Sequence, residues 1–277
     1  MTDLMPPQPP SPPYDLQLNT TMQTIATLVL WGGTIGLFGY SMVMARRERT
    51  VFPVVLVVAV AVGSLIEPMY DISYHLFWLD GGQQWTLFTS FGLPQPIWVM
   101  PAYVMVFGMP ALLMYKSLAK AVTLVQIFKF AGLTALTTAM FETTAINLGL
   151  YVYYGQSPWR LFNYPIFIGF MEGAQITGFA VLAALLSVYA TKQIHYLALF
   201  AIFPCNFAFE TLGAGFPALI VQNSSSNPNE LLLFLSAFAG VGLAATGLWW
   251  TSQSLLAVQR RRSVAGDLVQ SPVSGRV

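Results

Sequence analysis

The chain has 277 residues, of which 56% are apolar and 8% are charged, and its formal net charge is +1. A soluble domain usually has about a quarter of its residues charged, so this composition points to a membrane protein. The small net charge, with no Lys/Arg-rich helix or arm, argues against nucleic acid as a partner. The single cysteine excludes an intrachain disulfide, and two histidines are too few for a three-histidine zinc site or a di-iron site.

The chain begins with a Pro-rich stretch, and residues 1–20 are expected to form a disordered tail. Apolar runs long enough to cross a bilayer, about 20 residues each, follow at roughly 21–45, 51–78, 97–115, 122–152, 163–190, 195–221 and 230–257. The first run is too long for a signal peptide and lacks a basic leading region, so it is predicted to be a retained helix. We therefore predict one all-α domain over 21–257, a seven-helix transmembrane bundle, and a disordered cytosolic tail over 258–277.

Basic residues predict the orientation of this bundle. If the helices alternate, one side of the membrane receives ARRER (45–49), Lys116, Lys120, Lys192 and RRR (260–262), and the other receives only Arg160. The positive-inside rule then places the N-terminus outside and the C-terminus in the cytosol. The protein is expected to be a multi-pass protein of the plasma membrane or the endoplasmic reticulum. An aromatic belt at the outer interface is predicted from Trp78, Trp85, Trp98 and Trp159.

Four of the predicted helices carry acidic residues in their interior: Glu67, Asp71, Glu142, Glu172 and Glu210. A rise of about 1.5 Å per residue places all five in the middle and outer parts of the membrane. An ionisable group at that depth costs several kcal/mol and is by default a functional candidate. For a single acid, the alternative is a hydrogen-bonded contact between helices, but this explains five of them together less well. Lys129 lies near the cytosolic end of its helix and can reach the interface, so the acids must keep protons, or share a proton or a cation.

The stretch EPMYDISYHLFW (67–78) places Glu67, Asp71 and His75 four residues apart, on one stripe of a helix. Pro68 removes a backbone N–H and is expected to bend this helix by freeing the carbonyl of Ser64. We expect one interior cavity to collect the carboxyls of Glu67, Glu142, Glu172 and Glu210, with Asp71 and His75 nearer its outer mouth.

Amides and aromatic rings near the acids suggest the rest of the lining. Buried acids are usually hydrogen-bonded by nearby amides. The residues predicted to contact a substrate are Tyr70, Tyr74, His75, Asn206, Gln175 and Asn163, the last of which would open the fifth helix. A neutral carboxylic acid surrounded by aromatic faces can protonate an alkene or an epoxide, and the rings can stabilise the cation that forms.

Three stretches, EPMYDISYHLFW, GQQWTLFTSFGLPQPIW and GLYVYYGQSPWRLFNYPIF, resemble segments of uncharacterised bacterial multi-pass membrane proteins. In helix count, size and acid placement, the chain also resembles the membrane-integral terpene cyclases, which have seven helices and essential intramembrane acids. This resemblance implies cyclisation or isomerisation of an isoprenoid, but it contains no matched motif, so no residue role is carried over. A seven-helix retinal protein is disfavoured, because the run at 230–257 has no lysine.

Our leading hypothesis is an acid-catalysed enzyme acting on a hydrophobic isoprenoid. Glu67 would be the proton donor, Asp71 would share its proton, and Glu210 would be a second acid or would stabilise the cation. The first alternative is a proton- or cation-coupled transporter that uses the same carboxylates, and the second is an accessory membrane subunit. No cofactor is expected, although an acid cluster can hold Mg²⁺ through oxygen ligands. The expected partners are the lipid bilayer and a hydrophobic small molecule, and the oligomeric state is left open.

Overall fold

This computed structural model describes residues 10–225 and 227–270, with only the backbone of 263–270. Within these residues, seven helical spans are long and apolar enough to cross a membrane. They are Thr20–Glu48, Phe52–Tyr74, Val99–Lys120, Leu124–Asn147, Ile166–Tyr189, Gln193–Gly213 and Glu230–Arg262. The prediction of a helical membrane protein with seven spans is confirmed at this level.

Several spans are divided into shorter helical pieces, and short strands follow or precede them. In chain order the elements are α1 (Thr20–Glu48), α2 (Phe52–Gly63), η1 (Ser64–Ile66), α3 (Glu67–Tyr74), β1 (Leu76–Trp78), β2 (Thr86–Ser90), β3 (Leu93–Pro96), α4 (Val99–Tyr103), η2 (Val104–Gly108), α5 (Met109–Lys120), α6 (Leu124–Asn147), β4 (Tyr151–Tyr153), β5 (Arg160–Leu161), β6 (Tyr164–Pro165), α7 (Ile166–Tyr189), η3 (Gln193–Ala198), α8 (Leu199–Phe207), η4 (Ala208–Gly213), α9 (Phe216–Gln222) and α10 (Glu230–Gln270). Of the η segments, η1 and η3 are 3₁₀-helical and η2 and η4 are π-helical.

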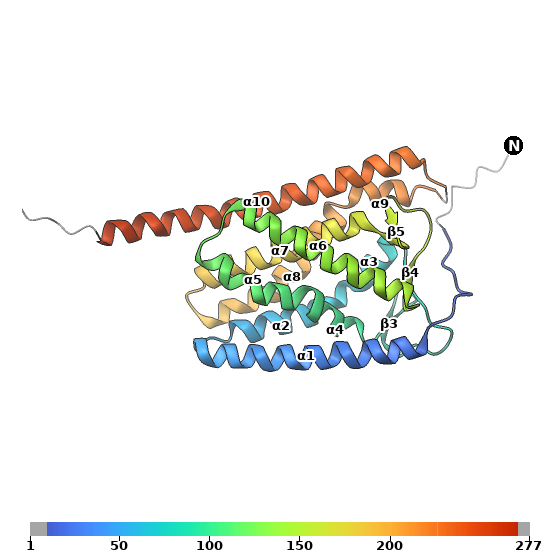
Figure 1. Cartoon of the computed structure of the whole chain (residues 1–277), viewed down its shortest axis with the longest axis horizontal. Helices are drawn as coiled ribbons and strands as arrows, with labels where there is room; N and C mark the ends of the chain where they lie inside the picture. The colour runs from blue at the N-terminus through green and yellow to red at the C-terminus, as the bar shows by residue number, and fades with distance from the viewer. Residues whose placement is uncertain (1–9, 226, 271–277) are drawn as a thin grey trace, which may run out of the picture.

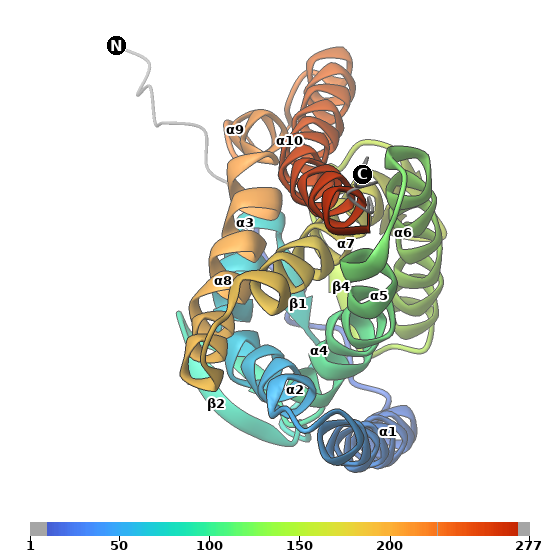
Figure 2. The same ribbon diagram turned by 90° about the vertical axis from the view of Figure 1, so that its left-hand side faces the viewer.

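Helix α7 lies at the centre of the bundle. It packs against α5, α6, α8 and α10, and Figure 2 shows it in the middle of the bundle seen end-on. Helix α1 lies at one edge, where it contacts α2 and α4. Most of the α7 span is buried and most of the α1 span is not, so a polar side chain on α7 faces protein, whereas α1 presents apolar side chains to lipid.

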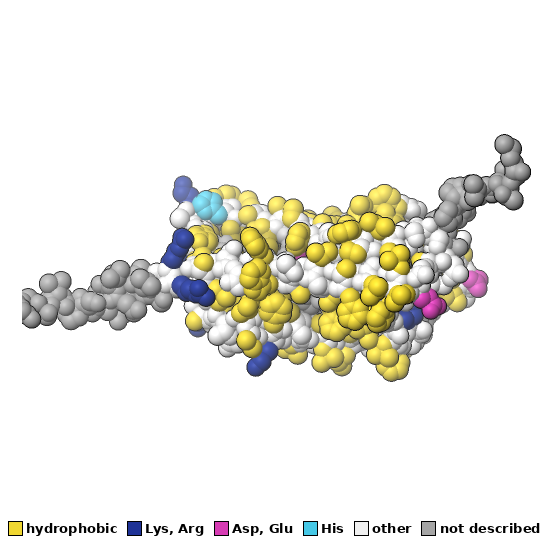
Figure 3. Space-filling view, turned by 90° about the horizontal axis from the view of Figure 1, so that it is seen from above, with side chains coloured by type: hydrophobic (Ala, Val, Ile, Leu, Met, Phe, Trp, Pro, Cys, Tyr) yellow, Lys and Arg dark blue, Asp and Glu magenta, His cyan; other side chains and the backbone are white. Residues whose placement is uncertain are grey.

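The two ends of the bundle differ in structure and charge. The strand pairs lie at the end where α1 begins, which we call the hairpin end (Figure 1). Lys and Arg side chains lie mainly at the opposite end, the basic end, and apolar side chains cover much of the surface between the two (Figure 3). The apolar band between two polar ends is what a membrane-spanning bundle requires.

The strand pairs correct the prediction of an all-α fold. Strand β1 pairs antiparallel with β4, so that Leu76 lies opposite Tyr153 and Trp78 lies opposite Tyr151. The predicted helices 51–78 and 122–152 end earlier than predicted, because α3 ends at Tyr74 and α6 ends at Asn147. His75 (φ 56°) follows α3 and Gly149 (φ 75°) follows α6, and a residue in the left-handed conformation ends an α-helix. Two further hairpins, β2–β3 and β5–β6, form in the loops of the same end.

The helix changes its hydrogen-bond pattern just before Pro68, but the carbonyl of Ser64 is not left free as predicted. The chain tightens into the 3₁₀ turn η1 between α2 and α3, immediately before Glu67 and Pro68, and the Ser64 carbonyl accepts a hydrogen bond from the Glu67 N–H. Proline has no N–H to donate to the carbonyl four residues earlier, so a 3₁₀ bond to the residue before it takes that place. This junction of two helical pieces carries Glu67, which is buried.

Both predicted tails differ in extent from the structure. Helix α10 continues past residue 258 to Gln270, so the predicted C-terminal tail begins too early, and residues 271–277 lie outside the described part. Residues 1–9 also lie outside it. Residues 10–19 contact the hairpin end, where the Tyr14 ring meets the Phe77 ring edge-on at 5.3 Å. Asn19 then caps α1 by accepting a hydrogen bond from the Met22 N–H (3.2 Å).

Candidate functional site

A small internal cavity of about 40 Å³, which we call the carboxylate cavity, lies beneath the β1–β4 strand pair. Three acids from three helices line it: Glu67 of α3, Glu142 of α6 and Glu172 of α7. The remaining lining is largely aromatic and comprises, among others, Tyr70, Trp78, Trp98, Tyr103, Phe107, Phe141, Tyr151 and Phe207. The prediction that acids from different helices converge on one aromatic interior space is therefore correct for three of the four carboxyls.

Tyrosine hydroxyls hold all three carboxyls. Tyr103 donates to Glu67, Tyr153 donates to Glu142 (3.1 Å) and Tyr164 donates to Glu172 (3.2 Å). The hydroxyl of Tyr70 lies 2.8 Å from that of Tyr153, so that Tyr70, Tyr153 and Glu142 form one hydrogen-bonded chain. Burial, followed by the nearby Glu142 carboxyl, raises the pKa of the Tyr153 hydroxyl well above its usual value, so this hydroxyl keeps its proton and acts as a donor.

Asp71 lies under the hairpin end and is fully buried, which corrects its predicted place near an open outer mouth. Its Oδ2 atom accepts hydrogen bonds from Trp78 Nε1 (2.8 Å) and Gln95 Nε2 (2.6 Å). The amide belongs to β3, so the hairpin covers the acid. Among the described residues, Asp71 Oδ1 has no hydrogen-bond partner. Glu67 lies one helical turn earlier on α3, on the same side of the helix as Asp71. Asp71 therefore connects the cavity acid Glu67 to the hairpin that closes this end.

His75 is not part of the cavity lining, contrary to the predicted substrate contact. Gln222 Nε2 donates to its Nδ1 (3.1 Å), which leaves the imidazole proton on Nε2, where it is donated to Asn223 Oδ1 (2.9 Å). The ring also stacks on Tyr154, with centroids 5.0 Å apart. Burial lowers the pKa of His75, and the bond to Asn223 opposes this in part. His75 thus fastens the end of α3 to the end of α9.

Glu210 lies outside the carboxylate cavity, which corrects its predicted membership. Phe207 of the same span lines the cavity instead. The π-helical segment η4 begins directly after Phe207 and contains Glu210. A π-helical turn is wider than an α-helical one, so Glu210 points in a different direction from the one that an α-helix would give. Glu210 points toward α10, where a Cβ atom added at Gly247 would lie 3.1 Å from Oε1.

Two of the predicted amides accompany Glu210 rather than the cavity acids. Asn206 Nδ2 donates to the backbone carbonyl of Gln175 (2.9 Å), and both Asn206 and Glu210 face Gly178 of α7. The Gln175 side chain is fully buried, and neither its oxygen nor its nitrogen has a hydrogen-bond partner in the part of the chain that the structure describes. The predicted hydrogen bond from Asn206 to Glu210 is not formed among the described residues, because the Asn206 amide donates to the backbone instead and Glu210 Oε2 has no partner there. Gln175 likewise makes no hydrogen bond to Glu172.

Two other predicted contacts have different roles. Asn163 is exposed in the turn between β5 and β6, with φ 67°, because α7 begins only at Ile166. Tyr74 is buried, and its hydroxyl donates to the backbone carbonyl of Thr211, so it joins α3 to η4 and does not line the cavity. Of the six predicted substrate contacts, only Tyr70 lines the carboxylate cavity.

Several residues around the carboxyls are not among the site residues predicted from the sequence. Trp78 and Trp98 are predicted to lie in the interfacial belt, yet they are 3% and 2% exposed and line the cavity. Tyr103, which lines the cavity, and Tyr164, which donates to Glu172, are not predicted. A tyrosine inside an apolar run is a signal that could have found them, because a buried hydroxyl needs a hydrogen-bond partner and the intramembrane acids are suitable acceptors.

The charge balance of the cavity is one-sided. Among the residues that the structure describes, no Lys or Arg lines the cavity. Arg160, at the hairpin end, donates instead to the backbone carbonyls of Tyr153 (3.1 Å) and Gly155 (3.2 Å). In the described part of the chain, no group of three or more His, Cys, Asp or Glu side chains is placed to hold a metal ion. The arrangement can therefore hold protons and pass them along hydrogen bonds.

Comparison of the chain with known protein families, with curated proteins and with solved structures gave no match.

Proposed function

We propose that the protein is a membrane-integral enzyme that uses a carboxylic acid to protonate a hydrophobic isoprenoid and so cyclises or isomerises it. The observation that carries this proposal is the carboxylate cavity: three acids, each held by a tyrosine hydroxyl, among aromatic rings and, in the described part of the chain, without a Lys or Arg in the lining. Ionising several carboxyls without a counter-ion in a low-dielectric interior is costly, so such a cluster retains protons. Aromatic faces can then stabilise a carbocation formed beside it.

Glu67 is the proposed proton donor and Asp71 its proton-sharing partner. The proton of Glu67 adds to an alkene carbon of the substrate, or to an epoxide oxygen whose C–O bond then opens, which leaves a carbocation and a Glu67 carboxylate. Loss of a proton from a carbon next to the cation forms the product alkene and returns a proton to the cavity, which balances the charge and restores neutral Glu67. Glu142 and Glu172 also line the cavity and can take that proton only after passing their own proton to Glu67. Glu210 has no part in this step, because it does not line the cavity.

We also propose that the basic end of the bundle faces the cytosol. The concentration of Lys and Arg at the basic end favours a cytosolic location for that end, and therefore an outer location for the hairpin end. Mg²⁺ has no assigned role, because the substrates considered carry no diphosphate, and a diphosphate would require Arg or Lys close by.

The test uses purified protein in lipid nanodiscs with farnesyl- and geranylgeranyl-derived alkenes and their terminal epoxides, in deuterium oxide. Turnover should incorporate deuterium from solvent into the product, which mass spectrometry detects. Glu67→Gln should reduce the rate by at least about 100-fold, the lower range for general acid catalysis. Glu230→Gln, at an exposed carboxyl at the start of α10, is the matched control and should have no effect. Full activity in Glu67→Gln would overturn the assignment.

A proton- or cation-coupled transporter is the second candidate. Two π-helical segments, η2 and η4, favour this candidate, and both belong to spans that border the cavity. Turns of this kind often occur at functional sites, and they offer the helix an alternative hydrogen-bond register. A transporter requires a route from the cavity to both faces of the membrane. Proteoliposomes containing a pH-sensitive dye would detect proton flux, and flux lost in Glu142→Gln without any product from the isoprenoid panel would favour this candidate over the enzyme.

A further inference from the structure

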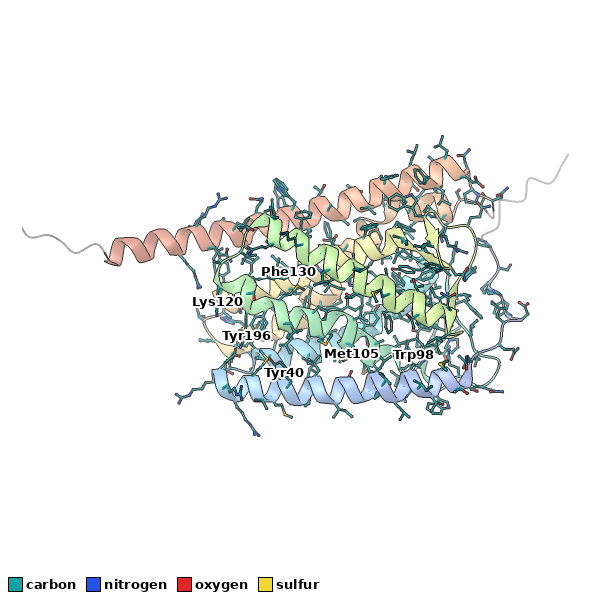
Figure 4. The ribbon with its side chains drawn as sticks, viewed as in Figure 1. Tyr40, Trp98, Met105, Lys120, Phe130 and Tyr196 are labelled. Carbon is teal, nitrogen blue, oxygen red and sulfur yellow. The ribbon has the colours of Figure 1, made fainter. Side chains whose placement is uncertain are left out.

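A lipid-facing fissure runs between α6 on one side and α1, η2 and α5 on the other. Its part nearer the basic end has a volume of about 530 Å³, and its part nearer the hairpin end about 400 Å³. Leu30 and Phe141 line both parts, so they form one continuous feature, which we call the α1–α6 fissure. Figure 4 labels three of its residues: Trp98 toward the hairpin end, Met105 at mid-length and Phe130 toward the basic end.

The fissure and the carboxylate cavity share a wall. Phe141 lines the cavity and both parts of the fissure, and Val106 lines the cavity and the larger part. Both side chains are only partly buried. Glu142 is the next residue after Phe141, so displacement of the Phe141 ring would connect a lipid-facing space directly to a cavity acid.

The volumes show why this connection matters. A cavity of about 40 Å³ has room for a few water molecules at most, whereas a small-molecule site usually measures about 300–1,000 Å³. The cavity alone therefore cannot enclose an isoprenoid, but either part of the fissure has the size of a ligand site. A long apolar molecule would fit with its chain in the fissure and one end past Phe141.

The fissure also contains an unused polar group. The Thr138 side chain is 2% exposed and lines the larger part, and its hydroxyl has no hydrogen-bond partner within residues 10–225 and 227–262. Thr138 lies one helical turn before Glu142 on α6, so both face the same side of the helix. An unpaired buried hydroxyl costs free energy unless a ligand supplies the partner. This hydroxyl could bind an epoxide or alcohol oxygen on its way to the acid.

We propose that the α1–α6 fissure binds the chain of an isoprenoid that enters sideways from the bilayer, and that Phe141 is the gate between this site and the carboxylate cavity. The nature of the occupant rests on the proposed function, because an isoprenoid carries double bonds that a carboxylic acid can protonate and a saturated acyl chain does not. The route past Phe141 follows only from the wall that the fissure and the carboxylate cavity share, and it does not depend on which molecule binds.

A hydrophobic carbodiimide tests the route without any enzyme assay. Dicyclohexylcarbodiimide partitions into lipid and adds to a protonated carboxyl, and peptide mass spectrometry locates the adduct. In nanodiscs, Glu142 and Glu67 should be labelled, and Phe141→Ala should accelerate labelling by at least about fivefold because it removes the gate. No labelling in either protein, or no acceleration in Phe141→Ala, would overturn the route.

Leu133 and Leu136 provide a matched pair of blocking variants. Both are on α6 and both are 58% exposed, but Leu133 lines the larger part of the fissure, whereas Leu136 lines a neighbouring lipid-facing groove of about 520 Å³. The lining of this groove shares Met140 and Thr144 with the smaller part of the fissure, but none of its described residues is among those that line the cavity. Leu133→Trp should slow labelling by at least about fivefold, and Leu136→Trp by less than about twofold, because only the first fills the fissure. Equal effects of the two variants would contradict the assigned route. Thermal unfolding of both variants checks that they fold.

Competition identifies the occupant. Farnesol should protect Glu142 from the carbodiimide in Glu67→Gln as well as in the wild type, so this measurement does not depend on turnover. Palmityl alcohol at the same concentration should not protect. Equal protection by both alcohols would show a site for any apolar chain and would refute the isoprenoid assignment. Protection by farnesol together with full activity of Glu67→Gln would retain the binding site and overturn the proposed chemistry.

Discussion

Replacing Asp71 should reveal how the hairpin end is held over the cavity. Asp71 Oδ2 accepts two hydrogen bonds, from Trp78 Nε1 at 2.8 Å and from Gln95 Nε2 at 2.6 Å. Both donors are on side chains no more than 3% exposed. Asp71→Ala leaves both without a partner, and each unsatisfied buried donor costs about 1–3 kcal/mol, so the free energy of unfolding should fall by about 2–6 kcal/mol.

Asp71→Asn separates the loss of hydrogen bonds from the loss of charge. The amide oxygen can occupy the Oδ2 position and accept both bonds, so the free energy of unfolding should change by less than about 1 kcal/mol. Equilibrium unfolding in mixed micelles measures all the variants, and Glu230→Ala is the control at an exposed acid. In the Asp71→Ala background, Gln95→Leu removes one of the two orphaned donors and should recover about 1–3 kcal/mol. The reasoning is wrong if Asp71→Ala is no less stable than Asp71→Asn.

Two further predictions concern the elements around the site. A Cβ atom at Gly215 would lie 1.9 Å from the Tyr74 hydroxyl and 2.1 Å from the backbone oxygen of Thr211. Gly215→Ala should therefore displace the ring and shift the backbone, which lowers the free energy of unfolding by about 3 kcal/mol or more. Gly213→Ala, whose nearest contact is 3.5 Å, should cost less, and equal losses would contradict the steric argument. Burial lowers the pKa of His75 in the folded protein. Below the unfolded pKa of about 6.5, the unfolded chain therefore binds more protons than the folded one. The free energy of unfolding should decrease as the pH falls through that value. His75→Asn, a residue type that tolerates the left-handed conformation, should show a smaller loss of melting temperature between about pH 7.5 and 5.5, and an unchanged loss would count against His75 as the cause.

The sequence by itself determined the number of membrane spans and the acids that lie within them. Both follow from local composition: an apolar run must be long enough to cross the bilayer, and an acid inside such a run must face protein. The irregularity at Pro68 was also predictable, because the missing N–H is a property of one residue and acts on its own helix, although the 3₁₀ bond that satisfies the Ser64 carbonyl was not.

Only the tertiary structure decided which acids meet. Glu67, Glu142 and Glu172 converge because α3, α6 and α7 pack with those faces inward, whereas the π-helical turn after Phe207 rotates Glu210 away from them. The pairing of β1 with β4 brings together segments more than 70 residues apart, and it places Trp78 over the cavity and not at the interface. Helix lengths and charges depend on neighbours in the chain, but a shared cavity depends on the rotation of each helix about its axis, which packing between distant segments sets.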